Sequence, residues 1–258
     1  MPILLSLDAM KKIYPKASSE VHHAFISDAA HSHLAASGIS ESPQRLATAL
    51  AHCSHETGGF TIRDLTENIN YTAERMAVVW PNRFPSASAV RAKYGTGHGW
   101  QKKAFDDIYG NRMGNRPGTS DGSAFIGRGG PQITGRDGYR EVGKRANLPL
   151  EDQPALACLP VNQPKIIAAF WSWKGLNKLA DSADPIGATV RPWNGGTNGL
   201  ADRRAEYARI LPIVQRLTSV PDLPDIPLPP NIEPVTQPAT SGLFHALLAL
   251  LAALFKRK

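Results

Sequence analysis

Glu56 is the residue whose type and position first point to chemistry. It lies in the last turn of a segment whose apolar residues recur at helical spacing: Leu46, Ala49, Leu50 and Cys53. The glycine pair that follows, Gly58-Gly59, ends the helix and lets a ligand approach closely. A half-buried carboxyl at this place would have a raised pKa and could hold a proton, as a general acid must. The alternative is an exposed glutamate at a helix end with no chemical role.

Two histidines, His52 and His55, precede Glu56 and raise the question of a metal site. Their order is His-x-x-His-Glu, which differs from the two zinc-binding arrangements that place a glutamate between or beside paired histidines. No third ligand is evident nearby. We therefore expect no metal and no other cofactor, and we expect one of the histidines to pack or hydrogen-bond near Glu56.

Hydrolysis of a glycosidic bond needs a second carboxylate across a cleft. The segment 63–71 supplies two candidates, Asp64 and Glu67, on what reads as an irregular loop. Two glycine-rich segments, 127–136 and 193–199, carry Gln, Thr and Asn, whose neutral side chains suit the hydroxyls of a sugar. Such loops can also cradle phosphate or form simple turns, but neither segment matches a phosphate-binding motif between a strand and a helix.

Together these segments resemble glycoside hydrolase family 19, the family of chitinases and phage endolysins. The matching pieces stand in the family's order and cover most of residues 1–217: His55-Glu-Thr-Gly-Gly-Phe60, Glu67-Asn-Ile-Asn-Tyr71, Asn111-Arg-Met-Gly-Asn115, Gly127-Arg-Gly-Gly-Pro-Gln-Ile-Thr-Gly-Arg136 and Asn194-Gly-Gly-Thr-Asn-Gly-Leu-Ala-Asp202. The resemblance implies a lysozyme-like α-helical fold with a deep cleft, and hydrolysis of β-1,4 bonds with inversion.

The resemblance also implies roles for individual residues. Glu56 falls on the family's general acid, Glu67 on its general base, and Thr134 on the hydroxyl residue that helps position the attacking water. The substrate-binding positions it implies are Gln132, Asn194, Tyr71 and Arg128. Of these, Arg128 is expected to be structural or to brace a carboxylate.

Two departures from the family pattern matter. The spacing from Glu56 to Glu67 is slightly longer than usual, so Asp64 remains an alternative general base. Gly138 stands where many relatives place an asparagine, which removes one expected contact. Inversion calls for a gap of roughly 6.5–9.5 Å or more between the two carboxyls, because a water must fit between base and sugar.

The elements that must position these residues are mainly helices. Helical patterns are predicted over about 20–36, 43–57, 72–80 and 164–173, and from about 199 onward. A serine followed by Pro43 is a typical helix start. Only about 124–133 suggests a short hairpin, so the fold class is mainly α. Cys53 and Cys158 are expected to be two reduced thiols.

The composition changes near Thr218, which divides the chain into three predicted parts. Residues 1–217 form the catalytic domain, and 218–240 form an extended linker in which seven of the eighteen residues from Pro221 to Pro238 are proline. Residues 241–258 form a helix with a broad apolar face and a cationic end. Its apolar segment of thirteen residues from Leu243 spans about 20 Å, too short for a hydrocarbon core of roughly 30 Å. We expect it to lie on anionic bacterial membranes, the alternative being a packing or oligomer contact.

The formal net charge of +7 fits an acidic polymer such as the bacterial cell wall. Nucleic acid is not expected, because the basic residues are scattered and form no stripe. The favoured reading is a peptidoglycan-degrading endolysin, expected to be monomeric, made in the host cytoplasm without a signal peptide and acting on the wall after release. A chitinase and a catalytically inert wall- or membrane-binding protein are the alternatives.

Overall fold

The computed structural model describes residues 1–218, and the predictions made for the linker and the C-terminal helix from 219 onward lie outside it. Within this part the chain is mainly helical, as predicted. The helices in chain order are α1 (Leu7–Ile13), α2 (Ser19–Phe25), α3 (Asp28–Ala36), α4 (Pro43–Thr57), α5 (Ala73–Val79), α6 (Ala87–Tyr94), α7 (Trp100–Tyr109), α8 (Asp121–Ala124), α9 (Arg136–Ala146), α10 (Gln163–Lys174), α11 (Asn177–Ala180), α12 (Pro185–Asn194) and α13 (Leu200–Arg216). Short 3₁₀ turns lie at Ile39–Glu41, Arg63–Leu65, Pro154–Cys158 and Pro160–Asn162.

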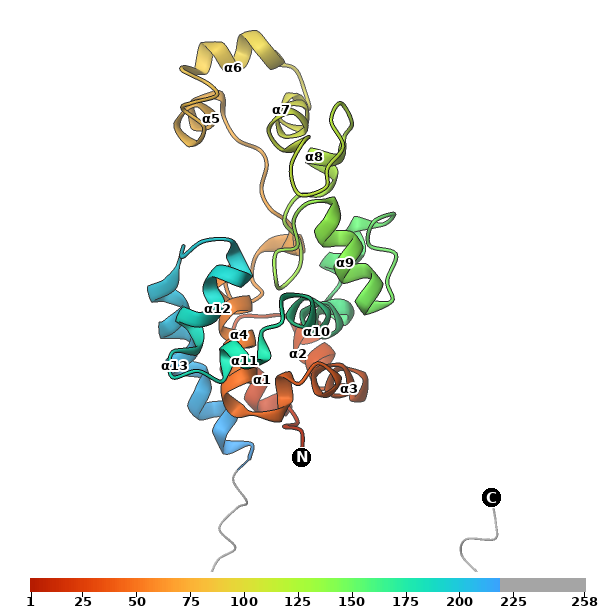
Figure 1. The fold of residues 1–258 in the computed structure, drawn as a ribbon, viewed down its shortest axis with the longest axis vertical. Helices are drawn as coiled ribbons and strands as arrows, with labels where there is room; N and C mark the ends of the chain where they lie inside the picture. The colour runs from red at the N-terminus through yellow and green to blue at the C-terminus, as the bar shows by residue number, and fades with distance from the viewer. Residues whose placement is uncertain (219–258) are drawn as a thin grey trace, which may run out of the picture. The chain divides into compact units, whose positions relative to one another are not determined.

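Two apolar clusters organise the described residues. The larger one gathers side chains from α1 to α4 and from α9 to α13, with Trp171, Tyr139 and Phe25 among its fully buried members. The smaller one joins α5, α6 and α7 around Phe105, Met76 and Phe84. Figure 1 shows α5 to α8 together at one end, separated from α1 to α4 at the other.

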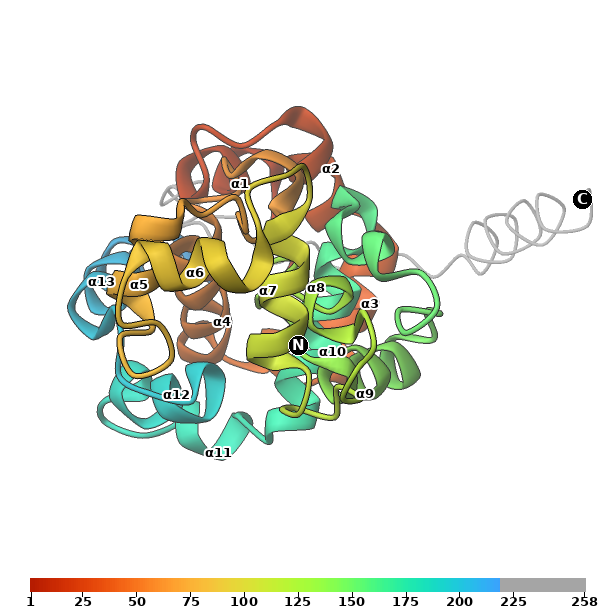
Figure 2. The ribbon, with the colours of Figure 1, turned by 90° about the horizontal axis from the view of Figure 1, so that it is seen from above.

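Helix α4 lies at the centre of the larger cluster. It packs along α13 and also contacts α11 and α12, which Figure 2 shows on the same side. Ten of its residues are buried, which fits the apolar stripe read from the sequence. The end of the stripe, where Glu56 stands, is thereby held against the last third of the described chain.

The helix predicted over 20–36 is wrong as a single element. The chain breaks at Ser27, whose hydroxyl accepts a hydrogen bond from Ala30 N at 3.2 Å and donates one to Ala24 O at 3.0 Å. This is an N-cap, so a new helix, α3, begins at Asp28. The local hydrogen-bonding capacity of one serine therefore overrides an otherwise continuous helical pattern.

The short hairpin predicted for about 124–133 does not form regular strands. Within the described residues β-structure amounts to two isolated antiparallel bridges, Thr66 with Arg128 and Arg128 with Ile133. Arg128 and Ile133 exchange both backbone hydrogen bonds, at 3.1 and 2.8 Å. The segment 127–134 is thus a loop closed by the one backbone pair of Arg128 and Ile133. Cys53 and Cys158 are free thiols, as predicted.

Candidate active site

Glu56 occupies the last turn of α4, and its side chain is 15% exposed. The helix begins where the Ser42 hydroxyl accepts the N–H of Arg45 at 3.1 Å. It ends at Gly58, whose left-handed φ of 58° suits glycine and whose N–H donates to Ser54 O. Both ends are therefore capped by residues that the sequence places there, and the carboxyl is held at the margin of the buried face.

The carboxyl of Glu56 is paired with Arg203 from α13. Arg203 is fully buried, and its guanidinium donates to Oε1 of Glu56, to Nδ1 of His52 at 2.9 Å and to Asn198 O at 3.3 Å. A planar guanidinium held by several acceptors has a fixed direction, so it orients the carboxyl that it touches.

The hydrogen bonds of His52 determine its tautomer. Because a guanidinium can only donate, Nδ1 of His52 must accept from Arg203. Nε2 therefore carries the proton and donates to Thr189 Oγ1 at 2.8 Å, and that hydroxyl donates to Pro185 O at 2.5 Å. Burial, followed by the charge of Arg203, lowers the pKa of His52 well below its usual value of 6.5. The imidazole is thus neutral. As expected from the sequence, one histidine lies near Glu56, and Arg203 links the two by donating to both.

His55 belongs to a different pocket. Its Nδ1 lies 2.5 Å from Asp202 Oδ2, and the two residues line a cavity of about 350 Å³ together with Ser54 and Glu206. Within residues 1–218 no group of three or more His, Cys, Asp and Glu side chains is arranged to hold a metal ion.

A pocket of about 260 Å³, here called the Glu56 pocket, gathers several of the residues singled out from the sequence. Gln132, Thr134 and Asn194 line it together with Glu56. Its remaining wall is largely aromatic and apolar, with one cation: Met113, Pro131, Phe170, Trp173, Lys174, Trp193 and Gly195. Polar groups set on an aromatic wall are what a saccharide ring, with its polar rim and apolar faces, requires.

The loop 127–134 carries Gln132 and Thr134 into this pocket. Gly130 N donates to the Oε1 of Gln163 at 2.7 Å, and Gln163 is fully buried in α10. Gln132 adopts a left-handed φ of 53°, and its side-chain amide donates to Gly129 O at 3.2 Å. A non-glycine residue in that conformation costs on the order of 1 kcal/mol, so the loop is held by its surroundings rather than by local preference.

Glu67 is hydrogen-bonded to Gly127, the first residue of the same loop. Its N–H donates to Gly127 O at 2.8 Å, and its Oε2 accepts from Gly127 N at 3.0 Å. It lines a second pocket of about 590 Å³, here called the Glu67 pocket, with Asn68, Ile69, Asn70 and residues 96–102.

Gly127 lines neither pocket but contacts residues of both. A Cβ placed on it would lie 2.5 Å from Gln132 Oε1 and 3.4 Å from Thr134 Oγ1, both in the Glu56 pocket. The backbone of the same residue holds the carboxylate of Glu67. Through Gly127 the loop therefore contacts residues that line each of the two pockets.

Asp64 is placed differently from Glu67. It is exposed, has a φ of 58° and lies in the short turn Arg63–Leu65. It is absent from the residues that line the Glu56 and Glu67 pockets.

Two further sequence candidates make contacts within the protein and do not line the Glu56 pocket. Tyr71 packs against Trp80 and Phe105 in the smaller cluster, with ring centroids 5.7 and 5.9 Å away. Arg128 donates to Ala124 O at 2.7 Å and to the Tyr139 hydroxyl at 2.9 Å. Its guanidinium thus braces the loop through a carbonyl and a hydroxyl, neither of which is a carboxylate.

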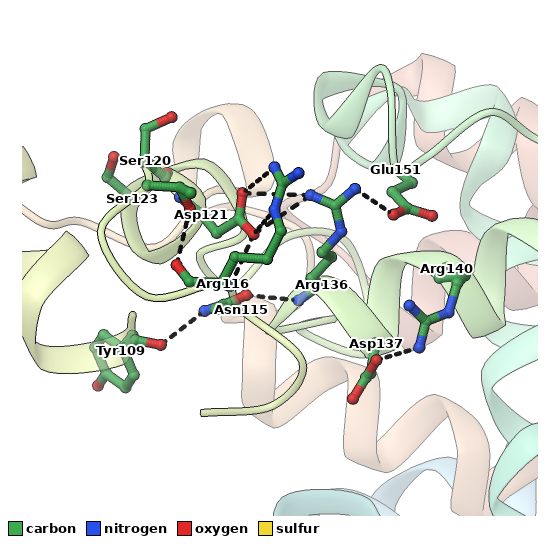
Figure 3. Close-up of polar contacts among 11 residues, drawn as sticks. Tyr109, Asn115, Arg116, Ser120, Asp121, Ser123, Arg136, Asp137, Arg140 and Glu151 are labelled. Carbon is green, nitrogen blue, oxygen red and sulfur yellow. Dashed lines mark hydrogen bonds and ion pairs between the residues drawn. The ribbon is translucent and has the colours of Figure 1, made fainter. Parts of the chain in front are cut away.

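Asn115, the last residue of the matching segment 111–115, anchors the loop (Figure 3). Asn115 accepts from Arg136 N at 2.8 Å and donates to Tyr109 O at 3.0 Å. Close by, Asp121 is nearly buried and accepts from Arg116 and Arg136. The hydrogen bonds from Arg116 hold the pKa of Asp121 well below its usual value. Arg136 begins α9, so this network fixes the C-terminal end of the loop.

The glycine at position 138 has a packing reason. It is buried in α9, where a Cβ would lie 3.2 Å from Ile133 Cγ2 and 3.9 Å from the Trp173 ring. Those side chains fill the place that an asparagine would need.

The sequence did not single out Arg203 or the aromatic wall. Arg203 directly follows the last matching segment, but its partner Glu56 lies 147 residues earlier, so no local pattern links them. Trp193 stacks on His52 with centroids 4.7 Å apart, and its buried indole N–H has no partner among the described residues.

Comparison with known proteins places this geometry in context. No model of a protein family matches the chain. A glycosyl hydrolase family 19 domain-containing protein of Haemophilus influenzae is 30% identical over 215 residues, which covers 82% of this chain and 98% of that protein. Chitinase C from Streptomyces griseus HUT6037 shares the fold, with a TM-score of 0.53 over 83% of this chain and 94% of its own, at 18% identity. A mutant of chitinase C gives a TM-score of 0.51 at 17% identity. The lysozyme-like, chitinase-like helical fold predicted from the sequence is thereby confirmed.

Proposed function

Because the chain belongs to glycoside hydrolase family 19, we propose that it is a glycosidase of the endolysin type that cuts the β-1,4 bonds of peptidoglycan. The proposed bond joins N-acetylmuramic acid to N-acetylglucosamine. The observation that supports glycan hydrolysis is the loop 127–134: its Gln132 and Thr134 share a pocket with Glu56, and its Gly127 N–H donates to Glu67.

In the proposed mechanism Glu56 protonates the leaving oxygen. Arg203 occupies its Oε1, which leaves Oε2 to carry the proton that is transferred. Glu67 takes a proton from a water on the opposite ring face, and its carboxylate is aimed by the N–H of Gly127. Thr134 positions that water, while Gln132 and Asn194 hold the sugar. Attack by water opposite to the leaving group inverts the anomeric centre.

Charge favours peptidoglycan over chitin. Chitin is neutral, whereas peptidoglycan carries carboxylates on its peptide stems, and the chain has a formal net charge of +7. The cationic end of 241–258 adds to this attraction, and we propose that this segment contacts anionic bacterial membrane. Action on the wall in the periplasm follows from the same proposal.

The second candidate function is a chitinase, which the fold of chitinase C supports. One experiment separates the two. The full-length protein is incubated with purified peptidoglycan and, in parallel, with chitin oligomers, and the products are identified by mass spectrometry. Glu56→Gln serves as the inactive control.

We expect muropeptides with a new reducing N-acetylmuramic acid end, absent from the Glu56→Gln reaction. Products from chitin alone would replace the proposal with the second candidate. Release of nothing from either substrate would contradict both and leave a binding protein.

The membrane contact has its own test. Removal of 241–258 is expected to leave hydrolysis of purified wall intact and to reduce lysis of whole cells that have an outer membrane. Equal lysis by the truncated protein would contradict the contact.

A further inference from the structure

Lys174 is a cation in the wall of the Glu56 pocket. It is the last residue of α10, and the negative end of the helix dipole favours a basic residue there. Its ammonium lies 3.9 Å from the ring centroid of Trp173 and 5.5 Å from that of Phe170. Both rings line the same pocket, so the charge stands on the aromatic wall beside the catalytic carboxyl.

Among the described residues the contacts of this ammonium are to the two aromatic rings, and no carboxylate contributes to the shift of its pKa. Partial burial lowers the pKa of Lys174, the desolvation cost expected of a cation without a carboxylate partner. Arg203 and Arg136, by contrast, are paired with carboxylates: Arg203 with Glu56, and Arg136 with Asp121 and Glu151. Arg128 donates to a carbonyl and a hydroxyl and does not line the pocket. Lys174 is therefore a cation in the sugar pocket whose counter-charge the described protein does not supply.

The chemistry of the two candidate substrates differs at the same point. N-acetylglucosamine has no charged group. N-acetylmuramic acid is the same sugar with a lactyl arm on O3, and this arm ends in a carboxyl or, in intact wall, in a peptide stem with carboxylates. An unpaired ammonium gains from a carboxylate ligand and gains little from a neutral sugar.

We propose that Lys174 is a specificity-determining residue that binds a carboxylate borne on the lactyl arm of N-acetylmuramic acid. This inference rests on the proposed function, since it assumes that the Glu56 pocket accepts a glycan of the wall. It goes further by naming the side chain that distinguishes an acidic amino sugar from a neutral one.

The test measures binding in the Glu56→Gln background, so that no ligand is consumed. Isothermal titration is carried out with three tetrasaccharides: a peptide-free fragment of wall glycan, the same fragment with peptide stems, and the neutral tetramer of N-acetylglucosamine. Each is measured with Lys174 intact and with Lys174→Met and Lys174→Arg. Lys178→Met, which removes an exposed lysine of α11, is the matched control.

We expect Lys174→Met to weaken binding of the acidic fragments about tenfold, as the loss of a charge-assisted hydrogen bond would. Lys174→Arg should retain most of the affinity, and Lys178→Met should change nothing. The peptide-free fragment shows whether the arm's own carboxyl is the ligand; a loss confined to the fragment with stems assigns the stem carboxylate instead. Added salt should weaken binding of the acidic fragments more in the protein with Lys174 than in the Lys174→Met variant.

An equal loss for the neutral tetramer, or no loss for either acidic fragment, would overturn the inference. Thermal unfolding of each variant shows whether Lys174→Met merely loosens the pocket. The proposed function fails separately, if the unmodified protein releases no muropeptides from the wall. Muropeptide release with unchanged binding by Lys174→Met would keep the function and remove the role of Lys174.

Discussion

The surroundings of Glu56 and Glu67 contrast in how they hold a carboxylate. Glu56 is held by side chains: a buried guanidinium from α13, which is itself fixed by a neutral histidine of α4. Glu67 is held by the backbone of one glycine, next to an open pocket. The first arrangement depends on the packing of two helices distant in sequence, and the second on the shape of one loop.

The difference matches the two proposed roles. A general acid must present one oxygen to the leaving group in a fixed direction, which a rigid paired guanidinium provides. A general base must leave room for a water, which a single backbone donor and a larger cavity provide. The comparison therefore predicts that changes around Glu56 act through side-chain contacts, and changes around Glu67 through the loop.

The largest expected effect comes from the proposed base, Glu67. Glu67→Gln should reduce kcat about 10³-fold, because general base catalysis is typically worth 10²–10⁴. Asp64→Asn is the matched variant and should leave kcat within a fewfold, since Asp64 lines neither pocket. The rates are measured as release of reducing ends from purified wall. The reverse pattern would move the base to Asp64.

Arg203→Met should come next, with kcat lowered about 10²-fold, because Glu56 and His52 both lose the donor that orients them. Leaving two buried acceptors unpaired should also destabilise the fold by about 3 kcal/mol in urea unfolding. Arg204→Met is the matched control: its partner Asp184 is exposed, so the change should stay within about 0.5 kcal/mol. Equal effects of the two variants would contradict the comparison.

The network around Asp121, which holds the C-terminal end of the loop, should contribute to the free energy of unfolding. Asp121→Asn removes a charge that accepts from Arg116 and Arg136, and should cost about 2 kcal/mol at pH 7. The pKa of Asp121 is lowered in the folded protein, so its contribution is present above the ordinary value near 3.8 and is lost as the pH falls through the lower folded value. The gap between the two proteins in urea unfolding should therefore persist to about pH 4 and shrink below it. Asp137→Asn, whose pair with Arg140 is exposed, should show no comparable gap.

Gly127→Ala tests whether the loop connects the two pockets. The new Cβ would meet Gln132 Oε1, the flexible end of a side chain, so the fold should stay stable while Gln132 moves. We expect kcat/KM to fall about tenfold, the loss of one oriented hydrogen bond to the sugar. In a Gln132→Ala background, Gly127→Ala should reduce kcat/KM little further, because the side chain that the new Cβ would displace is already gone. Full additivity would place the effect on Glu67 instead.

Much of the site could be predicted from the sequence because its residues lie in short, recognisable segments. Glu56, Gln132, Thr134 and Asn194 stand in three such segments, and the structure places them around one pocket. The apolar stripe also predicted α4, since burial of one face imposes the helical period, and Pro43 and the glycine pair predicted its bounds.

Arg203 could not be predicted in the same way. An arginine on a helix is usually exposed, and its burial follows only from the packing of α13 on α4. The break between α2 and α3 was missed because the side chain of Ser27 competes with the helix, a choice that apolar periodicity does not record. What the sequence leaves out is thus the pairing of distant polar groups.

The smallest expected effect concerns His52, at the far end of the Glu56 arrangement. His52→Gln can still accept from Arg203 or donate to Thr189, so it should cost about 1 kcal/mol and lower kcat only a fewfold. The informative readout is pH. The pKa of His52 is lowered in the folded protein, so on acidification the unfolded chain takes up a proton near pH 6.5 while the folded one does not. The stability of the native protein should therefore fall below about pH 6.5 more steeply than that of the glutamine variant, as measured by urea unfolding from pH 8 to pH 5. If the stability of the two proteins fell equally with pH, His52 would be protonated in the folded protein as well. It could then not be the neutral acceptor of the hydrogen bond from Arg203.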